Sequence, residues 1–222
     1  MSDRHSPSLF PLVRHISARL TPVLCRSSLS ANQVTFISLL LGLGASWSFG
    51  VASRGLEILG GGLLVACYVL DNCDGEVARF KGQCSEFGRR FDNFVDWAVH
   101  TAFFAALGWG ETQAGGQQVW LWLGGIAALG STINYIIGTI AEERESAKRQ
   151  EAAAKETPAK RPETWRQWIM FAFRELSRAD FCFIVMGLAV FGQTWILLPF
   201  GAIGAQAFWA VHLAPGAREY HV

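Results

Sequence analysis

The stretch DNCDGEVARFKGQCSEFGRRFDNFVD, residues 71–96, carries four aspartates between two segments that are otherwise apolar. Those segments, 56–80 and 86–109, each have about the length that a helix needs to cross the hydrocarbon of a membrane. Acidic residues are costly in hydrocarbon and mark a functional site when they occur in such helices. The stretch therefore predicts two antiparallel transmembrane helices that meet at a short turn near Lys81–Gln83, with their acidic ends together.

Apolar blocks of similar length recur along the whole chain, in which 51% of the 222 residues are hydrophobic. They predict an all-α integral membrane protein with a single domain over residues 1–222. The six expected spans of the bundle, which covers 33–213, are 33–53, 56–80, 86–109, 117–140, 167–190 and 193–213. Residues 7–24 predict an amphipathic helix lying on the membrane surface. The polar segment 141–166 predicts a cytoplasmic extension of the fourth span.

Charge and cysteine usage narrow the class of protein. The net charge is +1, which argues against a nucleic-acid partner. Five cysteines show no paired spacing that would indicate a disulfide framework or a zinc site. Basic residues fall at the termini, in the turn between spans two and three and in the segment after span four, with only Arg54 on the opposite side. Both termini and the aspartates are therefore expected to face the cytoplasm.

The polar positions of each helix share one face, because residues three or four apart are neighbours on a helix. On the first helix these positions are Asp71, Asp74, Gly75 and Ala78. On the second helix they are Gly88, Asp92 and Asp96. Four carboxylates brought together repel one another and are costly to desolvate, so we expect hard divalent cations to neutralise them. Two such ions would suit an in-line displacement at phosphorus.

The residues around the aspartates fit a phosphate-containing substrate. Gly75 and Gly88 lack side chains, and Ala78 is small, so a substrate can approach the helix backbone there. Arg79 supplies a planar cation that can bind phosphate through two hydrogen bonds. Ser85 offers a hydroxyl near the same place. An EF-hand calcium loop is excluded, because two of its ligand positions would fall on a cysteine and a glycine.

The full pattern, Asp71-x2-Asp74-Gly75-x2-Ala78-Arg79-x8-Gly88-x3-Asp92-x3-Asp96, resembles the signature of the CDP-alcohol phosphotransferase family at all eight fixed positions. An interfacial N-terminal helix, six spans and cytoplasmic termini agree with that family more loosely. The segment Ser30-Ala31-Asn32-Gln33-Val34-Thr35 is similar to the family's Asn-x-x-Thr element, with Ala31 where proline is common.

The resemblance implies a role for each matching residue. The four aspartates would bind two divalent ions, Mg²⁺ or Mn²⁺, and Asp96 would also act as the general base toward the acceptor hydroxyl. The residues implied to lie at the CDP portion of the donor are Gly75, Ala78, Arg79, Ser85, Gly88, Asn32 and Thr35. Attack at the phosphorus next to the transferred alcohol would release CMP. The family also implies a homodimer whose active sites open to the cytoplasm.

The substrates are less constrained than the chemistry. Within the family we expect phospholipid synthesis from CDP-diacylglycerol and a small polar acceptor alcohol. The segment 71–79 also resembles members that join CDP-inositol to inositol phosphate, so a soluble donor is the alternative. The chain reads Asp92-Asn-Phe-Val-Asp96 where phosphatidylglycerophosphate synthases have Asp-Pro-Leu-Ala-Asp, which disfavours glycerol 3-phosphate as the acceptor.

Other interpretations of the aspartates were weighed. Ion pairs with nearby cations would make them structural, and the candidate partners are Arg79, Lys81, Arg89 and Arg90. A membrane prenyltransferase would show two separate aspartate-rich motifs and more spans. A metal-ion transporter would hold its acids mid-span, whereas these lie near one end, beside a glycine and an arginine that suit phosphate.

Overall fold

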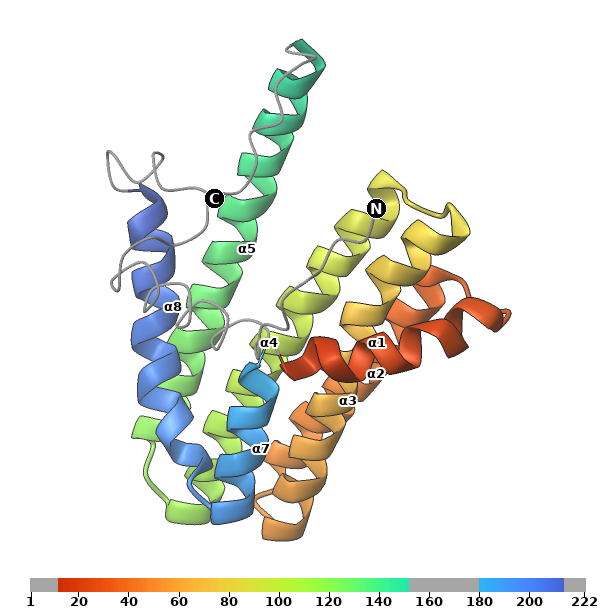
Figure 1. The fold of residues 1–222 in the computed structure, drawn as a ribbon. Coiled ribbons are helices and arrows are strands. Elements are labelled where there is room, and N and C mark those ends of the chain that lie inside the picture. Colours follow the sequence, from red (N-terminus) through yellow and green to blue (C-terminus); the bar gives the residue numbers. More distant parts are fainter. Residues whose placement is uncertain (1–11, 152–179, 214–222) are drawn as a thin grey trace, which may run out of the picture.

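The computed structural model describes residues 12–151 and 180–213, and the elements in those ranges are all helical (Figure 1). They are α1 (Leu12–Arg26), α2 (Ala31–Gly50), α3 (Arg54–Lys81), α4 (Glu86–Gly115), α5 (Val119–Glu151), α7 (Phe181–Phe191), the 3₁₀ turn η1 (Thr194–Ile196) and α8 (Leu197–Leu213). The all-α prediction is confirmed for this part of the chain.

Within the described residues, three helices are long and apolar enough to cross a membrane: α2, α3 and the first part of α5, Val119–Ala141. Together with α4 they fall on the first four predicted spans. The fifth predicted span, 167–190, and the polar segment 141–166 lie partly outside the described residues. The helical extension of span four is confirmed as far as Glu151. The number of six spans stays a prediction.

The ends of the helices that carry the aspartates follow from local sequence. Helix α2 begins with a capping box, in which the Ser30 side chain accepts from the Gln33 backbone N–H and the Gln33 side chain accepts from the Ser30 N–H. Helix α3 ends at Gly82, whose φ of +64° is the left-handed conformation that glycine adopts without strain. Helix α4 begins after Ser85, whose hydroxyl accepts from the Gly88 N–H. The turn of residues 82–85 therefore has its own stop and start signals.

Helix α2 packs against both α3 and α4, whereas the consecutive helices α3 and α4 have few close backbone contacts with each other. The two helices that were expected to be direct neighbours are thus held together mainly by α2, which packs against both. At the core, the rings of Phe49 from α2 and Phe103 from α4 meet edge to face, 5.1 Å apart. Gly110 allows α4 to approach α2 closely, because a Cβ there would lie 2.1 Å from the Phe49 carbonyl oxygen.

Helix α1 lies across the long helices rather than along them (Figure 1). Both carboxylate oxygens of Asp180, next to the start of α7, accept hydrogen bonds from the first backbone N–H groups of α1, at Leu12 (3.0 Å) and Val13 (3.1 Å). The face that α1 buries includes Val13 and Ser17, whereas Leu12 and Ile16 are exposed. Residues 7–11 of the predicted surface helix lie outside the described part, and its location on a membrane stays a prediction.

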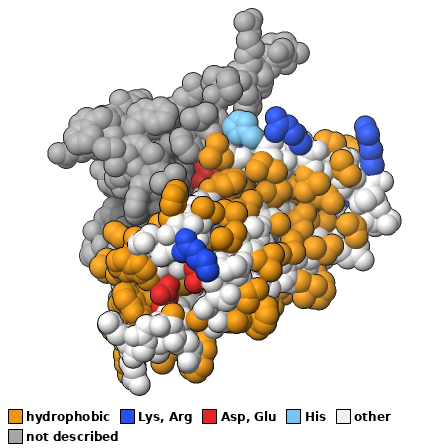
Figure 2. Space-filling model, turned by 90° about the horizontal axis from the view of Figure 1, so that it is seen from below, with side chains coloured by type: hydrophobic (Ala, Val, Ile, Leu, Met, Phe, Trp, Pro, Cys, Tyr) orange, Lys and Arg blue, Asp and Glu red, His pale blue; other side chains and the backbone are white. Residues whose placement is uncertain are grey.

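The surface of the described bundle suits hydrocarbon. Exposed apolar side chains follow α2 from Phe36 through Leu40 to Trp47. Figure 2, seen from the end that holds the α2–α3 turn, shows a mostly hydrophobic described surface with few charged side chains. Arg54, the cation predicted alone on this side, donates to the Val190 carbonyl oxygen at 2.6 Å. A backbone carbonyl therefore provides a partner for that charge.

Candidate functional site

The predicted carboxylates converge from two helices. Asp71 and Asp74 on α3 and Asp92 on α4 each place a carboxylate oxygen within 4.8 Å of the others. Asp96 lies one turn further along α4 than Asp92, on the same face of the helix. The structure thus brings together three of the four predicted aspartates, Asp71, Asp74 and Asp92, and the part of Asp96 in the site stays a prediction.

Helix α2 contributes a hydroxyl to the cluster. The Thr35 Oγ1 donates to Asp74 Oδ2 at 2.5 Å, and both side chains are buried, at 3% and 6% exposure. A hydroxyl–carboxylate bond of this length is charge-assisted and stronger than a neutral one. Thr35 was expected near the nucleotide, and the structure places it against a carboxylate instead. Its contact with a donor stays a prediction.

The donor set fits a hard divalent cation. The three converging groups offer only carboxylate oxygens, which are the ligands that Mg²⁺ and Mn²⁺ prefer. Mg²⁺ binds through one or two carboxylates and completes its shell with water and substrate phosphates. Asp71, Asp74 and Asp92 would hold such an ion, and Asp96 is near enough to extend the site to a second.

The first turn of α4 lies against the start of α2. A Cβ on Gly88 would lie 3.1 Å from Asn32 Oδ1 and 3.2 Å from Ser85 Oγ, so this position is tight for any larger residue. Three residues predicted at the nucleotide, namely Gly88, Asn32 and Ser85, are therefore neighbours here. The Ser85 hydroxyl also has a structural role, because it caps α4.

Arg79 and Gly75 are neighbours on α3. The position that a Gly75 Cβ would occupy is 3.5 Å from Arg79 Nη1, and no other side chain of the described residues lies within 4 Å of it. The absence of a side chain therefore leaves open space above the helix at this point, beside an exposed guanidinium. Ala78, on the same face, keeps the surface shallow. The arrangement has room for an anionic group next to the carboxylates.

The other cations near the turn have partners of their own. The Lys81 ammonium donates to the carbonyl oxygens of Ser27 (2.9 Å) and Leu29 (2.6 Å). Arg89 and Arg90 both pair with the carboxylate of Glu86, at 2.7 and 2.9 Å. These contacts do not support the interpretation in which Lys81, Arg89 and Arg90 serve mainly to neutralise the aspartates.

Two contacts of the α3–α4 turn were not foreseen. Besides the Lys81 bonds, the Gln83 side-chain oxygen accepts from the Ala31 backbone N–H at 2.9 Å. Both side chains thus hold the loop of residues 27–30, which sets where α2 begins and where Asn32 and Thr35 lie. The partners are about 50 residues apart in the chain, so no local spacing in the sequence signals them.

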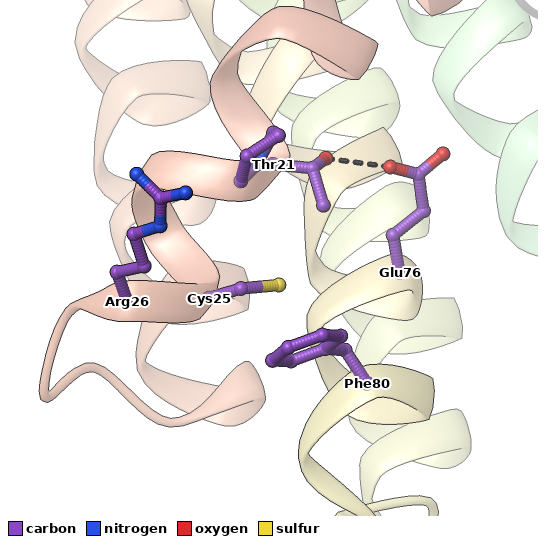
Figure 3. Close-up of a pocket in the computed structure, with 6 residues that line it drawn as sticks. Thr21, Cys25, Arg26, Glu76 and Phe80 are labelled. Carbon is purple, nitrogen blue, oxygen red and sulfur yellow. Dashed lines mark hydrogen bonds between the residues drawn. The ribbon is translucent and has the colours of Figure 1, made fainter.

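A separate hollow of about 330 Å³ lies between α1 and α3 (Figure 3). It is lined by Thr21, Pro22, Cys25, Arg26, Glu76 and Phe80. The Thr21 hydroxyl donates to Glu76 Oε2 at 2.6 Å. Glu76 follows Asp74 by two residues, which turns its side chain to roughly the opposite face of the helix. The hollow is therefore distinct from the carboxylate cluster.

Comparison with known proteins identifies the family to which this site belongs. The sequence profile of the CDP-alcohol phosphatidyltransferase family matches residues 28–195, which include α2, the turn of residues 82–85 and all four aspartates. This chain belongs to the CDP-alcohol phosphatidyltransferase family. The match confirms the family that residues 71–96 resemble.

Individual relatives match only in part. Over 96 residues the chain is 35% identical to a bifunctional IPC transferase and DIPP synthase of Aquifex aeolicus, covering 43% of this chain and 21% of that protein. Over 86 residues it is 34% identical to an archaetidylinositol phosphate synthase of Pyrococcus horikoshii, covering 39% of this chain and 44% of that protein. The chain thus spans less than half the length of these curated relatives.

The fold is also similar to a solved structure. The Mycobacterium tuberculosis phosphatidylinositol phosphate synthase with CDP-DAG bound superposes with a TM-score of 0.54 at 20% identity, covering 94% of this chain and 99% of that chain. At this identity the likeness concerns the fold alone.

Proposed function

We propose that this enzyme transfers an inositol phosphate group from CDP-inositol to a hydroxyl of inositol phosphate and releases CMP. The observation that carries the reaction type is the convergence of Asp71, Asp74 and Asp92 from two helices, with Asp96 alongside. Divalent metal bound there would neutralise the charge of the donor's diphosphate. The same metal would also neutralise the three carboxylates, which lie within 4.8 Å of one another and repel in its absence.

The chain's own residues have distinct tasks in this proposal. Asp96 takes the proton from the acceptor hydroxyl as its oxygen forms a bond to the phosphorus next to the transferred alcohol. The bond from that phosphorus to the bridging diphosphate oxygen breaks, and CMP leaves. Arg79 and the first turn of α4 at Gly88 bind the CDP portion, with Asn32 beside them. Thr35 orients the Asp74 carboxylate through its hydrogen bond.

The acceptor is proposed from the relatives and from the sequence. An archaetidylinositol phosphate synthase, by its name, makes a product that carries inositol phosphate. Residues 71–79 resemble members that join CDP-inositol to inositol phosphate. The acceptor class is thus common to both lines of support. It replaces the broader expectation of any small polar alcohol.

The donor separates the two candidate functions. The soluble donor is supported by the resemblance of residues 71–79 and by the similarity to the IPC transferase and DIPP synthases. The second candidate uses CDP-diacylglycerol with the same acceptor, and the similarity to the archaetidylinositol phosphate synthase favours a lipid-linked donor of this kind. In both cases we place the site at the cytoplasmic face, on the basis of the basic residues, and expect a homodimer.

The test is CMP release by the purified protein in detergent with Mg²⁺ or Mn²⁺. Inositol phosphate is offered with CDP-inositol and, separately, with CDP-diacylglycerol, while free inositol, serine and glycerol phosphate serve as competing acceptors. Release that requires CDP-inositol and inositol phosphate supports the first candidate, and release with CDP-diacylglycerol makes the second correct. Turnover with serine or glycerol phosphate but not with inositol phosphate would refute the proposed acceptor.

A further inference from the structure

A direct hydrogen bond joins α3 to α4 beneath the carboxylates. The Tyr68 hydroxyl lies 2.8 Å from His100 Nε2, and the other ring nitrogen, Nδ1, lies 2.8 Å from the backbone carbonyl oxygen of Asp96. Tyr68 is buried, at 8% exposure. The His100 ring stacks on Phe181 of α7 at 6.2 Å. The pair is therefore fixed on several sides.

The two bonds determine where the protons lie. A carbonyl oxygen can only accept, so Nδ1 of His100 carries a proton and donates it to the Asp96 oxygen. In the neutral ring Nε2 is then bare, and the Tyr68 hydroxyl must be the donor to it. With the ring in that neutral form, the connection between the helices adds no charge to a region that already holds four carboxylates.

The position of the pair relates it to the site. Tyr68 precedes Asp71 by three residues on α3, and His100 follows Asp96 by four on α4, so each lies one turn further from the turn at 82–85 on the same face as the aspartates. The two helices have few close backbone contacts with each other, and their like-charged carboxylates push them apart.

We propose that Tyr68 and His100 are positioning residues that hold α3 and α4 at the separation at which Asp71 and Asp96 serve the same metal site. This inference rests on the carboxylate site of the proposed function. Neither residue belongs to the eight fixed positions of the sequence signature. The pair acts through the aspartates, by opposing their repulsion and by anchoring the helix turn that carries Asp96.

The test compares Tyr68→Phe and His100→Asn with the unaltered protein by two measurements. Mn²⁺ affinity is read from the free-ion signal in electron paramagnetic resonance, without any substrate. Residues that orient metal ligands typically contribute about 10- to 100-fold to metal affinity or activity. We expect each variant to bind Mn²⁺ about 10-fold more weakly and to lower kcat by a similar factor, with the donor KM changed less than about twofold. The double variant should add little, because both changes remove the same bond.

Thr194→Val is the matched control. Its hydroxyl donates to Glu111 Oε1 at 2.9 Å at the other end of the bundle, so the control loses one interhelical bond away from the carboxylates. It should lower the melting temperature but leave Mn²⁺ affinity and kcat unaltered. Unaltered Mn²⁺ affinity in Tyr68→Phe, or an equal loss in the control, overturns the inference. The Mn²⁺ measurement needs no substrate, so it tests the positioning role even if no CDP-linked donor supports turnover. Failure of the proposed function would show as absent CMP release in the unaltered protein.

Discussion

Replacing Thr35 with valine would remove one hydroxyl at almost constant volume, and the structure indicates how much that hydroxyl contributes. The bond to Asp74 is 2.5 Å long and lies between groups that are 3% and 6% exposed. A buried hydrogen bond to a charged group typically stabilises by about 1.5–3 kcal/mol, and the short length and burial favour the upper half of that range. The variant should therefore be less stable by about 2–3 kcal/mol.

Metal binding should respond as well, because the hydroxyl fixes the orientation of a carboxylate that faces the site. We expect Thr35→Val to weaken Mn²⁺ or Mg²⁺ binding by about 10-fold or more, whereas Thr35→Ser, which keeps the hydroxyl, should stay close to the unaltered protein. The assays are thermal unfolding in detergent and calorimetric titration with Mn²⁺.

Thr21→Val provides the control for this comparison. The Thr21 hydroxyl donates to Glu76 at 2.6 Å. Glu76 lies on α3, as Asp74 does, but on the opposite face of that helix, in the hollow of Figure 3. It should lower stability without altering Mn²⁺ affinity. Equal Mn²⁺ affinities for the Thr35 and Thr21 variants would refute the reasoning that places Thr35 in the metal site.

Four further predictions follow from single contacts. Asp96→Asn should keep the fold and CDP binding but abolish CMP release, and full activity would remove its role as the base. Arg79→Ala should raise the Kd for CDP by about 10-fold or more, through loss of a charged hydrogen bond, in a direct binding assay; an unaltered Kd would remove it from the nucleotide site. Asp180→Asn should lower the free energy of unfolding by about 1–3 kcal/mol and increase hydrogen exchange in α1, because the asparagine NH2 group would face one of the two backbone N–H donors. Unchanged exchange would contradict the anchoring role. Lys81→Met should weaken CDP binding more than Mn²⁺ binding, since it releases the loop before α2; the reverse order would contradict that role.

The sequence was sufficient for the parts of the fold that depend on local patterns. The turn was expected near Lys81–Gln83, and the structure places it at residues 82–85, between the end of α3 and the cap at Ser85. The spacing of the aspartates on two faces is equally local. Helix α4 continues to Gly115, beyond the predicted end of the third span at residue 109. The convergence of Asp71 and Asp92 could also be expected, because a short turn makes their helices antiparallel. These features need no knowledge of distant contacts.

Contacts between distant segments could not be predicted in the same way. The Lys81 ammonium bonds two carbonyl groups of the loop before α2. The sequence near Lys81 does not reveal this, because a lysine that binds phosphate at the surface would look the same. Which side of α1 the bundle covers could not be predicted either: Val13 and Ser17 are buried, whereas Leu12 and Ile16 are exposed. Both sides of α1 carry apolar residues, and only the position of α3 decides which side is covered.

The central claim is that the aspartates of α3 and α4 form one divalent-metal site for the transfer reaction. Anomalous diffraction from crystals containing Mn²⁺ and CDP tests it most directly. We predict two peaks, both within coordinating distance of carboxylates from Asp71, Asp74, Asp92 and Asp96. Mn²⁺ located elsewhere in a protein that releases CMP, or CMP release that persists without any divalent metal, would contradict the account.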